Sequence, residues 1–194
     1  MNYRTSQEIR KQSDRLLESQ FTDVDGQSED RTGTISVFSG PKPHVIRPKS
    51  PSDESNQVAH WIRKQLSQGI LQNEICVIVR SENEIPRAFD AISKSGCKSR
   101  DLADSNTRDL SSVTMATMHL VKGLEYRAVV VMACDDDVVP LQSRIENVGD
   151  DADLQEIYTT ERQLLYVACT RARDCLLLSG VDPASEFLDD FEGS

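Results

Sequence analysis

Four short apolar runs constrain the fold of this chain more than any other feature of its 194 residues. They span residues 75–79, 113–116, 128–133 and 175–178. An uninterrupted apolar run of four to eight residues is typical of a strand covered on both faces, as in a parallel sheet between two layers of helices. These runs therefore predict a buried parallel sheet.

Helical patterns alternate with the strand-like runs. Three segments carry apolar side chains at helical spacing: 5–17, 54–68 and 84–95. Gly96 is placed to end the last of these, and Trp61 is predicted to be a core residue rather than a base-stacking surface. Strands alternating with helices predict an α/β fold with right-handed crossovers. Weaker strand candidates lie at 34–38 and 44–47, whereas the polar stretch 98–112 is predicted to be irregular.

The charge balance argues against a protein that binds nucleic acid over its whole surface. Lys and Arg number 22 against 32 Asp and Glu, so the net charge is −10. A local basic groove is still compatible with this total, because binding follows the charge at the groove. The acids crowd one loop (135–137, 150, 151 and 153) and the tail 182–194. Both segments are predicted to be solvated.

The five cysteines form no C-x-x-C pair and no metal-ligand spacing with the three histidines. They are therefore predicted to be reduced thiols, several of them buried, and no metal site is expected. No signal peptide, apolar run of membrane-spanning length or lipidation motif is present. We expect a soluble cytoplasmic protein without a membrane partner.

The segment TMHLVKGLEY, residues 117–126, is the first of two charged signatures. It follows one strand-like run and precedes the next. Ligands of parallel sheets bind just past the carboxyl ends of the strands. Thr117, His119, Lys122 and Glu125 are predicted to lie there, although His119 read alone is an ordinary loop histidine and Lys122 read alone only shapes the turn.

The second signature is ERQLLYVACTRAR, residues 161–173. Leu164, Leu165, Ala168 and Arg171 fall at helical spacing, which places the Arg171 guanidinium on an otherwise apolar side. A permanent charge in that position needs an anionic partner. The partner is either a carboxylate of this chain or a phosphate in a cleft, and the first signature favours the phosphate.

Both signatures resemble motifs of the second, C-terminal RecA-like motor domain of UvrD/Rep-type superfamily I DNA helicases. The first is similar to T-x-H-x-x-K-G-L-E-[FY] and the second to E-R-x-L-x-Y-V-A-x-T-R-A. The segment NYRTSQEIR, residues 2–10, resembles the family's N-Y-R-[ST] motif, so three motifs stand in the family's order. Two departures are the DDDVVP run at 135–140, which lacks a common glycine, and Thr160, which replaces a frequent acid.

The resemblance implies a RecA-like, P-loop NTPase-type parallel sheet over residues 1–194 as a single motor domain. Segment 22–56 would be a loop or short appendage in place of the usual helical insertion, and 182–194 an acidic tail. The phosphate-loop pattern G-x-x-x-x-G-K-[ST] is absent from the sequence, and no strand ending in an Asp-Glu pair for Mg²⁺ is evident. ATP and Mg²⁺ would therefore be held mainly by an N-terminal motor domain of the same protein.

The resemblance also implies roles for individual residues around ATP. Tyr3 would stack on the adenine, and Glu125 would accept a hydrogen bond from the ribose. Arg4 and Arg171 would be arginine fingers that stabilise charge on the γ-phosphate. Arg173 is predicted to be a surface charge rather than a further finger.

Thr117 and His119 would contact the phosphates of single-stranded DNA, giving affinity without sequence preference. The leading hypothesis is an ATP-dependent DNA helicase in which this chain, expected to be monomeric, is inactive alone. The alternative is a degenerate, non-enzymatic helicase module that binds nucleic acid or a protein partner. A nuclease would need an additional carboxylate-and-lysine domain, of which the tail shows no sign.

Overall fold

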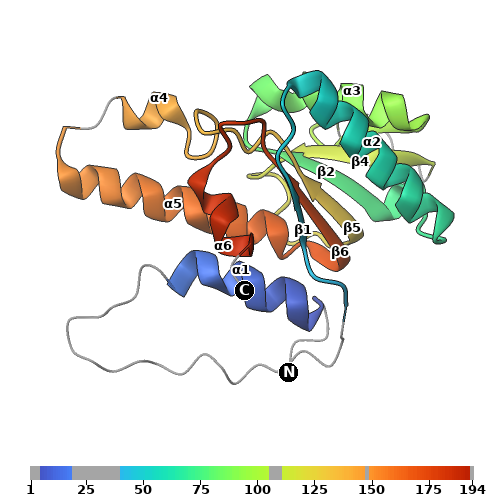
Figure 1. Cartoon of the computed structure of the whole chain (residues 1–194), viewed down its shortest axis with the longest axis horizontal. Helices are drawn as coiled ribbons and strands as arrows, with labels where there is room; N and C mark the ends of the chain where they lie inside the picture. Colours follow the sequence, from blue (N-terminus) through green and yellow to red (C-terminus); the bar gives the residue numbers. More distant parts are fainter. Residues whose placement is uncertain (1–4, 19–39, 105–110, 147–148, 193–194) are drawn as a thin grey trace.

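The computed structural model describes residues 5–18, 40–104, 111–146 and 149–192 of the chain. Six strands form one sheet in the order β1-β6-β5-β2-β4-β3, and every neighbouring pair is parallel (Figure 1). The strands are β1 His44–Ile46, β2 Ile75–Val79, β3 Lys98–Asp101, β4 Ser112–Thr117, β5 Tyr126–Val131 and β6 Ala172–Ser179. The predicted parallel α/β sheet is confirmed.

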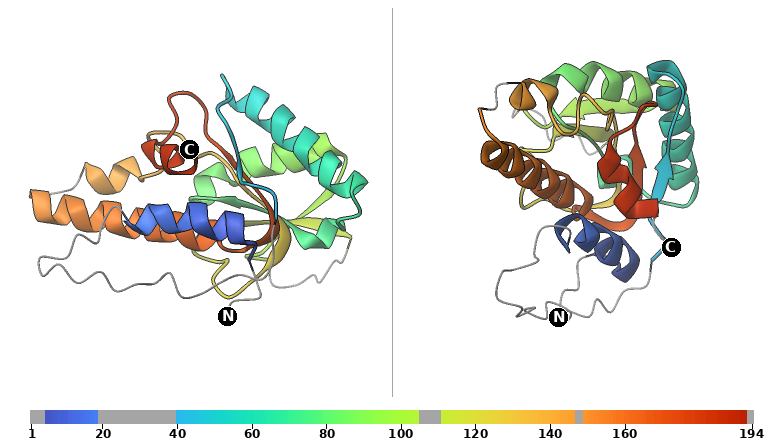
Figure 2. Two further views of the ribbon diagram at one scale, coloured as in Figure 1. Left: turned by 60° about the horizontal axis from the view of Figure 1, so that its bottom comes forward. Right: turned by 60° about the vertical axis from the view of Figure 1, so that its left-hand side comes forward.

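Helices cover both faces of this sheet. Helices α1 (Gln7–Glu18) and α5 (Asp151–Cys169) pack on one face, and α2 (Pro51–Ser67) and α3 (Ile85–Ser95) pack on the other, as Figures 1 and 2 show. Strand β2 serves both layers: Cys76 and Ile78 join the α1/α5 core, whereas Ile75, Val77 and Val79 join the α2/α3 core. Because successive side chains of a strand point to opposite faces, a strand buried on both must be apolar throughout.

Local sequence signals explain where the long helices begin and end. Helix α2 starts at Pro51, three residues before the predicted start, because the Ser50 hydroxyl accepts a hydrogen bond from the Asp53 N–H at 3.2 Å. Gly96 follows α3 with a φ of +84°, a conformation that costs glycine little. Two further short helices are α4 (Gln142–Ile145) and α6 (Asp189–Glu192).

Strand β3 contradicts the prediction of an irregular 98–112 stretch. Its residues, Lys-Ser-Arg-Asp, pair in parallel with β4 at the edge of the sheet. These side chains are exposed or half-buried, so the strand carries no apolar pattern that the sequence could reveal. The 34–38 candidate lies outside the described residues, while the 44–47 candidate is confirmed as β1. The described part of 22–56 thus contributes the other edge strand and the start of α2.

Helix α5 begins ten residues before the second signature, inside the stretch predicted to be an acidic loop. The Asp150 carboxylate accepts a hydrogen bond from the Asp153 N–H at 2.9 Å, and Asp151 and Asp153 occupy the first turn. Acidic side chains are favourable at this end of a helix because they face its unpaired N–H groups and positive dipole. Three acidic residues that were predicted to lie in a loop, Asp150, Asp151 and Asp153, therefore form the start of α5.

Asp135, another acid that was predicted to be solvated, is half-buried. Its carboxylate accepts hydrogen bonds from Arg87 Nη1 at 2.5 Å and from the Val181 N–H at 2.7 Å. Arg87 also pairs with Glu54, a fully buried residue of α2. Glu54 in turn accepts hydrogen bonds from the Ala133 N–H at 3.0 Å and from a serine hydroxyl at the end of β6 at 2.7 Å. It therefore joins α2 to the ends of β5 and β6.

The C-terminal segment, residues 182–192, packs on the body of the domain through its apolar side chains. The prediction of a solvated tail therefore holds for exposed acids such as Glu186 but not for the segment as a whole. Phe187, Leu188 and Phe191 are buried in the α1/α5 core. Three neighbouring acids are paired: Asp190 with Arg162, and Asp189 and Glu192 with Arg47. The acidic composition of this segment gave no sign that these three apolar side chains would be buried.

All five cysteines are free thiols, as predicted. Cys76, Cys134 and Cys169 are buried, and burial raises the pKa of each of these thiols. Cys97 and Cys175 are half-buried. Within the ranges that the structure describes, no helix has both the length and the apolar character needed to cross a membrane.

Candidate functional site

The first signature connects β4 to β5 without a helix. Met118 and Val121 are buried in the α1/α5 core, and Gly123 adopts a φ of +84° in the turn that leads to β5. Because β4 and β5 are parallel, this segment starts at the carboxyl edge of the sheet and must end at the amino edge. Thr117 and His119 therefore lie near one edge and Glu125 near the other. The prediction that all of them lie past the carboxyl ends is wrong for Glu125.

A buried ion pair stands at the carboxyl edge. Arg80, which directly follows β2, donates from Nε and Nη2 to the two carboxylate oxygens of Glu161 at 2.6 Å each. The exposed fractions of the two side chains are 5% and 0%. Arg144 Nη1 adds a third hydrogen bond to Glu161 at 3.0 Å. Burial alone would raise the pKa of Glu161, but the two guanidinium groups outweigh it and hold the pKa below its usual value.

This ion pair also positions His119. Arg80 Nη1 lies 3.3 Å from His119 Nε2, and the imidazole is exposed. A guanidinium only donates, so Nε2 accepts in this contact and the ring proton belongs on Nδ1. Thr117 is only 9% exposed at the end of β4. Of the two residues predicted to face a DNA strand, His119 is the accessible one.

Arg171 lies at the opposite edge, one residue beyond Thr170, the cap of α5, and not on the helix itself. Its Nε donates to the Val167 carbonyl at 3.0 Å, Nη1 to the Leu124 carbonyl at 3.1 Å, and Nη2 to the Thr170 hydroxyl at 3.3 Å. The side chain thus satisfies a carbonyl at the negative end of α5 and fastens the end of the first signature.

Arg171 makes no ion pair with any carboxylate in the described part of the chain. The sequence left two possible partners for Arg171, a carboxylate of this chain or a phosphate. The described residues do not supply the carboxylate. The internal ion pair belongs to Arg80 and Glu161, which sequence reasoning missed. A single charged residue directly after a buried strand was the available signal for Arg80, and the first letter of the second signature was the signal for Glu161.

The start of α1 lies beside the end of α5. The Thr5 hydroxyl donates to the Thr170 carbonyl at 3.3 Å, and the Ser6 N–H donates to the Arg173 carbonyl at 3.0 Å. Tyr3 and Arg4 lie outside the described residues. Arg173 is an exposed charge paired with Asp174 at 2.9 Å, as predicted.

Glu125 and Lys122 are both exposed, and Glu125 immediately precedes Tyr126, whose N–H donates to the Arg171 carbonyl at 2.9 Å. The predicted ribose-binding residue and one predicted finger therefore lie at the same edge of the sheet. Among the residues with described positions, no group of three His, Cys, Asp or Glu side chains is arranged to hold a metal ion.

Comparison with known proteins identifies relatives of this region. Residues 88–182 match the family described as the UvrD-like helicase C-terminal domain. The protein YjcD of Bacillus subtilis (strain 168) is 42% identical over 79 residues, which are 40% of this chain and 10% of YjcD. The ATP-dependent DNA helicase PcrA of Staphylococcus aureus (strain MRSA252) is 35% identical over 79 residues, 41% of this chain and 10% of PcrA. Each match thus spans about a tenth of the relative's length.

A solved structure has the same fold over nearly the whole chain. It is the C-terminal domain of a possible DNA helicase from Lactobacillus plantarum WCFS1, with a TM-score of 0.67 and 22% sequence identity. The similarity covers 98% of this chain and 94% of that one. The fold therefore extends to both sides of the segment that matches the family.

Proposed function

Residues 88–182 of this chain belong to the UvrD-like helicase C-terminal domain family, and from this premise we propose that the chain is the second motor domain of an ATP-dependent DNA helicase. It would work against a first motor domain of the same protein, which carries the phosphate loop that this sequence lacks. Closing the two domains on ATP would complete the catalytic site.

The position of Arg171 carries the proposal. A guanidinium has five N–H donors, and the described residues accept three hydrogen bonds from this one, none through a carboxylate. Its charge is therefore held rigidly between α5 and Leu124 without being neutralised there. A γ-phosphate presented by the first motor domain would supply the missing anion, and the guanidinium would stabilise charge on the transferring phosphoryl oxygens.

The described start of α1 supports a role for Arg4 in the same place. Arg4 directly precedes Thr5, and Thr5 and Ser6 are hydrogen bonded to the backbone on either side of Arg171. We assign Arg4 as a second finger and Tyr3 to the adenine on the basis of the motif. Glu125 is exposed beside the strand that holds the Arg171 carbonyl, which suits a hydrogen bond to the ribose.

The residues present fit phosphate better than they fit Mg²⁺. Arg171 offers an unneutralised cation, whereas the described residues include no carboxylate cluster of metal-binding geometry. Bound Mg²⁺ would neutralise phosphate charge, and its ligands would come from the first motor domain. This chain's own contribution would be to orient the γ-phosphate and to stabilise its charge through Arg171.

His119 supports single-strand binding at the other edge of the sheet. Arg80 holds the exposed imidazole by its Nε2, which leaves the Nδ1 proton to donate to a phosphate oxygen. Thr117 would add a contact from the end of β4. Phosphate contacts of this kind give affinity without base preference.

The test is ATP turnover of the full-length protein carrying Arg171→Ala or Arg171→Lys. Losing an arginine finger lowers turnover by about 10³–10⁵-fold in other phosphoryl-transfer enzymes, and we expect a loss of this order for alanine. Lysine keeps the charge but not the planar fork, so it should restore little turnover. The melting temperature should fall by only a few degrees, because alanine loses hydrogen bonds at a helix end but empties no core.

Arg173→Ala is the matched control, since Arg173 is exposed and lies two residues along the chain. It should leave both turnover and melting temperature near those of the parent. A large fall in melting temperature for Arg171→Ala with preserved turnover per folded molecule would contradict the finger assignment. A full-length protein with no DNA-stimulated turnover at all would favour the non-enzymatic binding module instead.

A further inference from the structure

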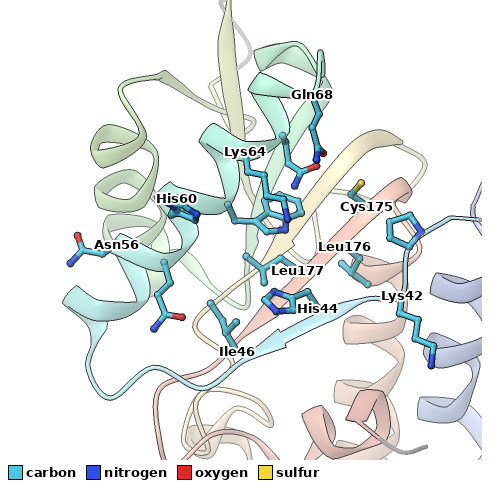
Figure 3. A pocket seen from close by; sticks show the side chains of 14 residues that line it. Lys42, His44, Ile46, Asn56, His60, Lys64, Gln68, Cys175, Leu176 and Leu177 are labelled. Carbon is cyan, nitrogen blue, oxygen red and sulfur yellow. The ribbon is translucent and has the colours of Figure 1, made fainter.

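A cavity of about 680 Å³ lies between helix α2 and the strands β1 and β6 (Figure 3). It is on the α2/α3 face of the sheet, opposite the face against which the first signature packs. Ile46 and Leu177 supply an apolar floor, and the residues from Asn56 of α2 to Gln68, its C-cap, supply a wall. A cavity of this size lies in the range of small-molecule sites.

The charge of the cavity is opposite to that of the chain. The protein carries 32 acids against 22 Lys and Arg, yet no Asp or Glu occurs among the described residues that line the cavity. Four lining residues are Lys or His: Lys42, His44, His60 and Lys64. None of these side chains makes an ion pair or hydrogen bond with a described residue. Lysine ammonium groups and imidazole N–H donors without a partner in the described part of an acidic protein favour an anionic ligand.

Two of these residues face each other across the cavity. In Figure 3, Lys64 extends from α2 and His44 from β1, and Leu177 is drawn between them. Lys42 lies at the margin and points away. An anion between Lys64 and His44 would therefore accept hydrogen bonds from both sides, from the lysine ammonium group and from a ring N–H of the histidine.

Trp61, the only tryptophan of the chain, also lines the cavity. It is half-buried and packs against the α2/α3 core, so the prediction of a core residue holds for part of the ring. The rest of the indole lies outside that core and contributes to the lining of the cavity. Aromatic rings of this kind stack on nucleobases.

Gln65 also lines the cavity, but it is only 4% exposed. Its Oε1 is buried without a hydrogen-bond partner among the described residues, so this oxygen does not face a ligand in the cavity. The ligand that suits the accessible lining therefore combines a negative charge with a flat ring.

We propose that this cavity binds a nucleotide unit, with the base against Trp61 and the phosphate between Lys64 and His44. A free mononucleotide and one residue of a single strand share this chemistry. An acidic peptide would match the charge but offers no ring for the indole. The inference depends on the proposed function only in expecting a DNA strand as one source, and its test requires no ATP turnover.

The single tryptophan allows a direct test with the 194-residue chain. Deoxyadenosine monophosphate and a deoxyadenosine decamer are titrated separately while Trp61 fluorescence is excited at its red edge, where the bases do not absorb. We expect a saturable change with at least one of them. Lys64→Gln should weaken binding about tenfold, because it removes a charge-assisted contact. Lys98→Gln, the same change on β3 at the opposite edge of the sheet, should leave it unaltered.

The two ligands distinguish the sources. Saturation by the mononucleotide supports a self-sufficient nucleotide site, and saturation by the decamer alone supports a strand site. The proposal is overturned if neither changes the fluorescence, if Lys64→Gln and Lys98→Gln weaken binding equally, or if a hexaglutamate peptide reproduces the response. Each of these results leaves the Arg171 experiment untouched, so the two proposals fail separately.

Discussion

Arg80 and Glu161 lie 81 residues apart in sequence and meet in a nearly water-free position. Burying two charges is costly, and their attraction compensates only when the geometry is good and the remaining donors are satisfied. Here the contact is bidentate, and Arg144 and His119 use further hydrogen-bonding capacity. The pair therefore links stability to the position of a predicted DNA-binding side chain.

Glu161→Gln should destabilise the fold strongly, because it leaves the buried Arg80 guanidinium without its counterion. The expected cost is about 3–5 kcal/mol, a fall in melting temperature of roughly 6–20 °C for a chain of this length. Thermal unfolding at pH 7 measures it. Asp90→Asn is the control, since Asp90 and Lys94 form an exposed pair at 2.8 Å that should contribute at most about 1 kcal/mol. Equal effects of the two changes would contradict the assignment.

The same pair should make stability depend on pH. The pKa of Glu161 is lowered in the folded state, so as pH falls the unfolded chain takes up this proton before the folded chain does. The stabilisation by Glu161 is thus complete above about pH 5 and is lost as pH falls through the lowered pKa. The difference in unfolding free energy between the parent and Glu161→Gln should shrink accordingly below about pH 4.5. A difference that stays constant down to pH 3 would rule this out.

The C-terminal segment, through residues 186–188 and α6, closes one side of the α1/α5 core. Phe187 packs edge-on against Tyr158 of α5, with ring centroids 5.9 Å apart. The Arg162 guanidinium lies 4.3 Å from the Phe187 ring centre and also pairs with Asp190. The C-terminal segment is therefore held by buried apolar side chains, including Phe187, and by ion pairs to Arg162 and Arg47.

Phe187→Ala should cost about 3–5 kcal/mol, because it empties a fully buried site against α5. Phe89→Ala offers a matched control of the same chemistry, since Phe89 of α3 is 54% exposed and should change stability by less than about 0.5 kcal/mol. Chemical denaturation of both variants measures the difference. Similar stabilities for the two variants would show that the segment is a dispensable tail.

The domain as a whole carries its candidate functional residues at two opposite edges of the sheet. Arg171 and Glu125 lie at the amino ends of the central strands, and Arg80, Thr117 and His119 at the carboxyl ends. Neither edge carries a phosphate loop, because the sequence contains none. In the proposed helicase each edge would be half of a site completed by the first motor domain.

The 194-residue chain alone should therefore hydrolyse no ATP and bind single-stranded DNA weakly. Phosphate contacts dominate such binding, so the remaining affinity should fall steeply as salt rises. Steady-state turnover with and without DNA, and strand binding at two salt concentrations, test both statements. DNA-stimulated turnover that survives Arg171→Ala would refute the role of Arg171 at ATP. Tight binding that is insensitive to salt would refute the roles of Thr117 and His119 at the DNA strand.

The order of strands and helices follows from local patterns in the sequence. The four apolar runs became β2, β4, β5 and β6 because a strand buried on both faces has no position for a polar side chain. Three motifs in a fixed order also pointed to the helicase family, and residues 88–182, which contain two of them in full, match the model of its C-terminal domain. Roles around ATP and DNA stay predictions.

Packing between distant segments decided the rest. Strand β3 and the C-terminal segment have polar sequences, and their places depend on a neighbouring strand and on the α1/α5 core. The pairing of Arg80 with Glu161 and the cavity beside Trp61 join residues from separate elements, whose meeting no local periodicity encodes. Arg171 was predicted on a helix because its spacing continues that of α5, but the helix ends at Cys169. Spacing along a chain describes one face of one element, whereas a charge finds its partner only when the elements are assembled.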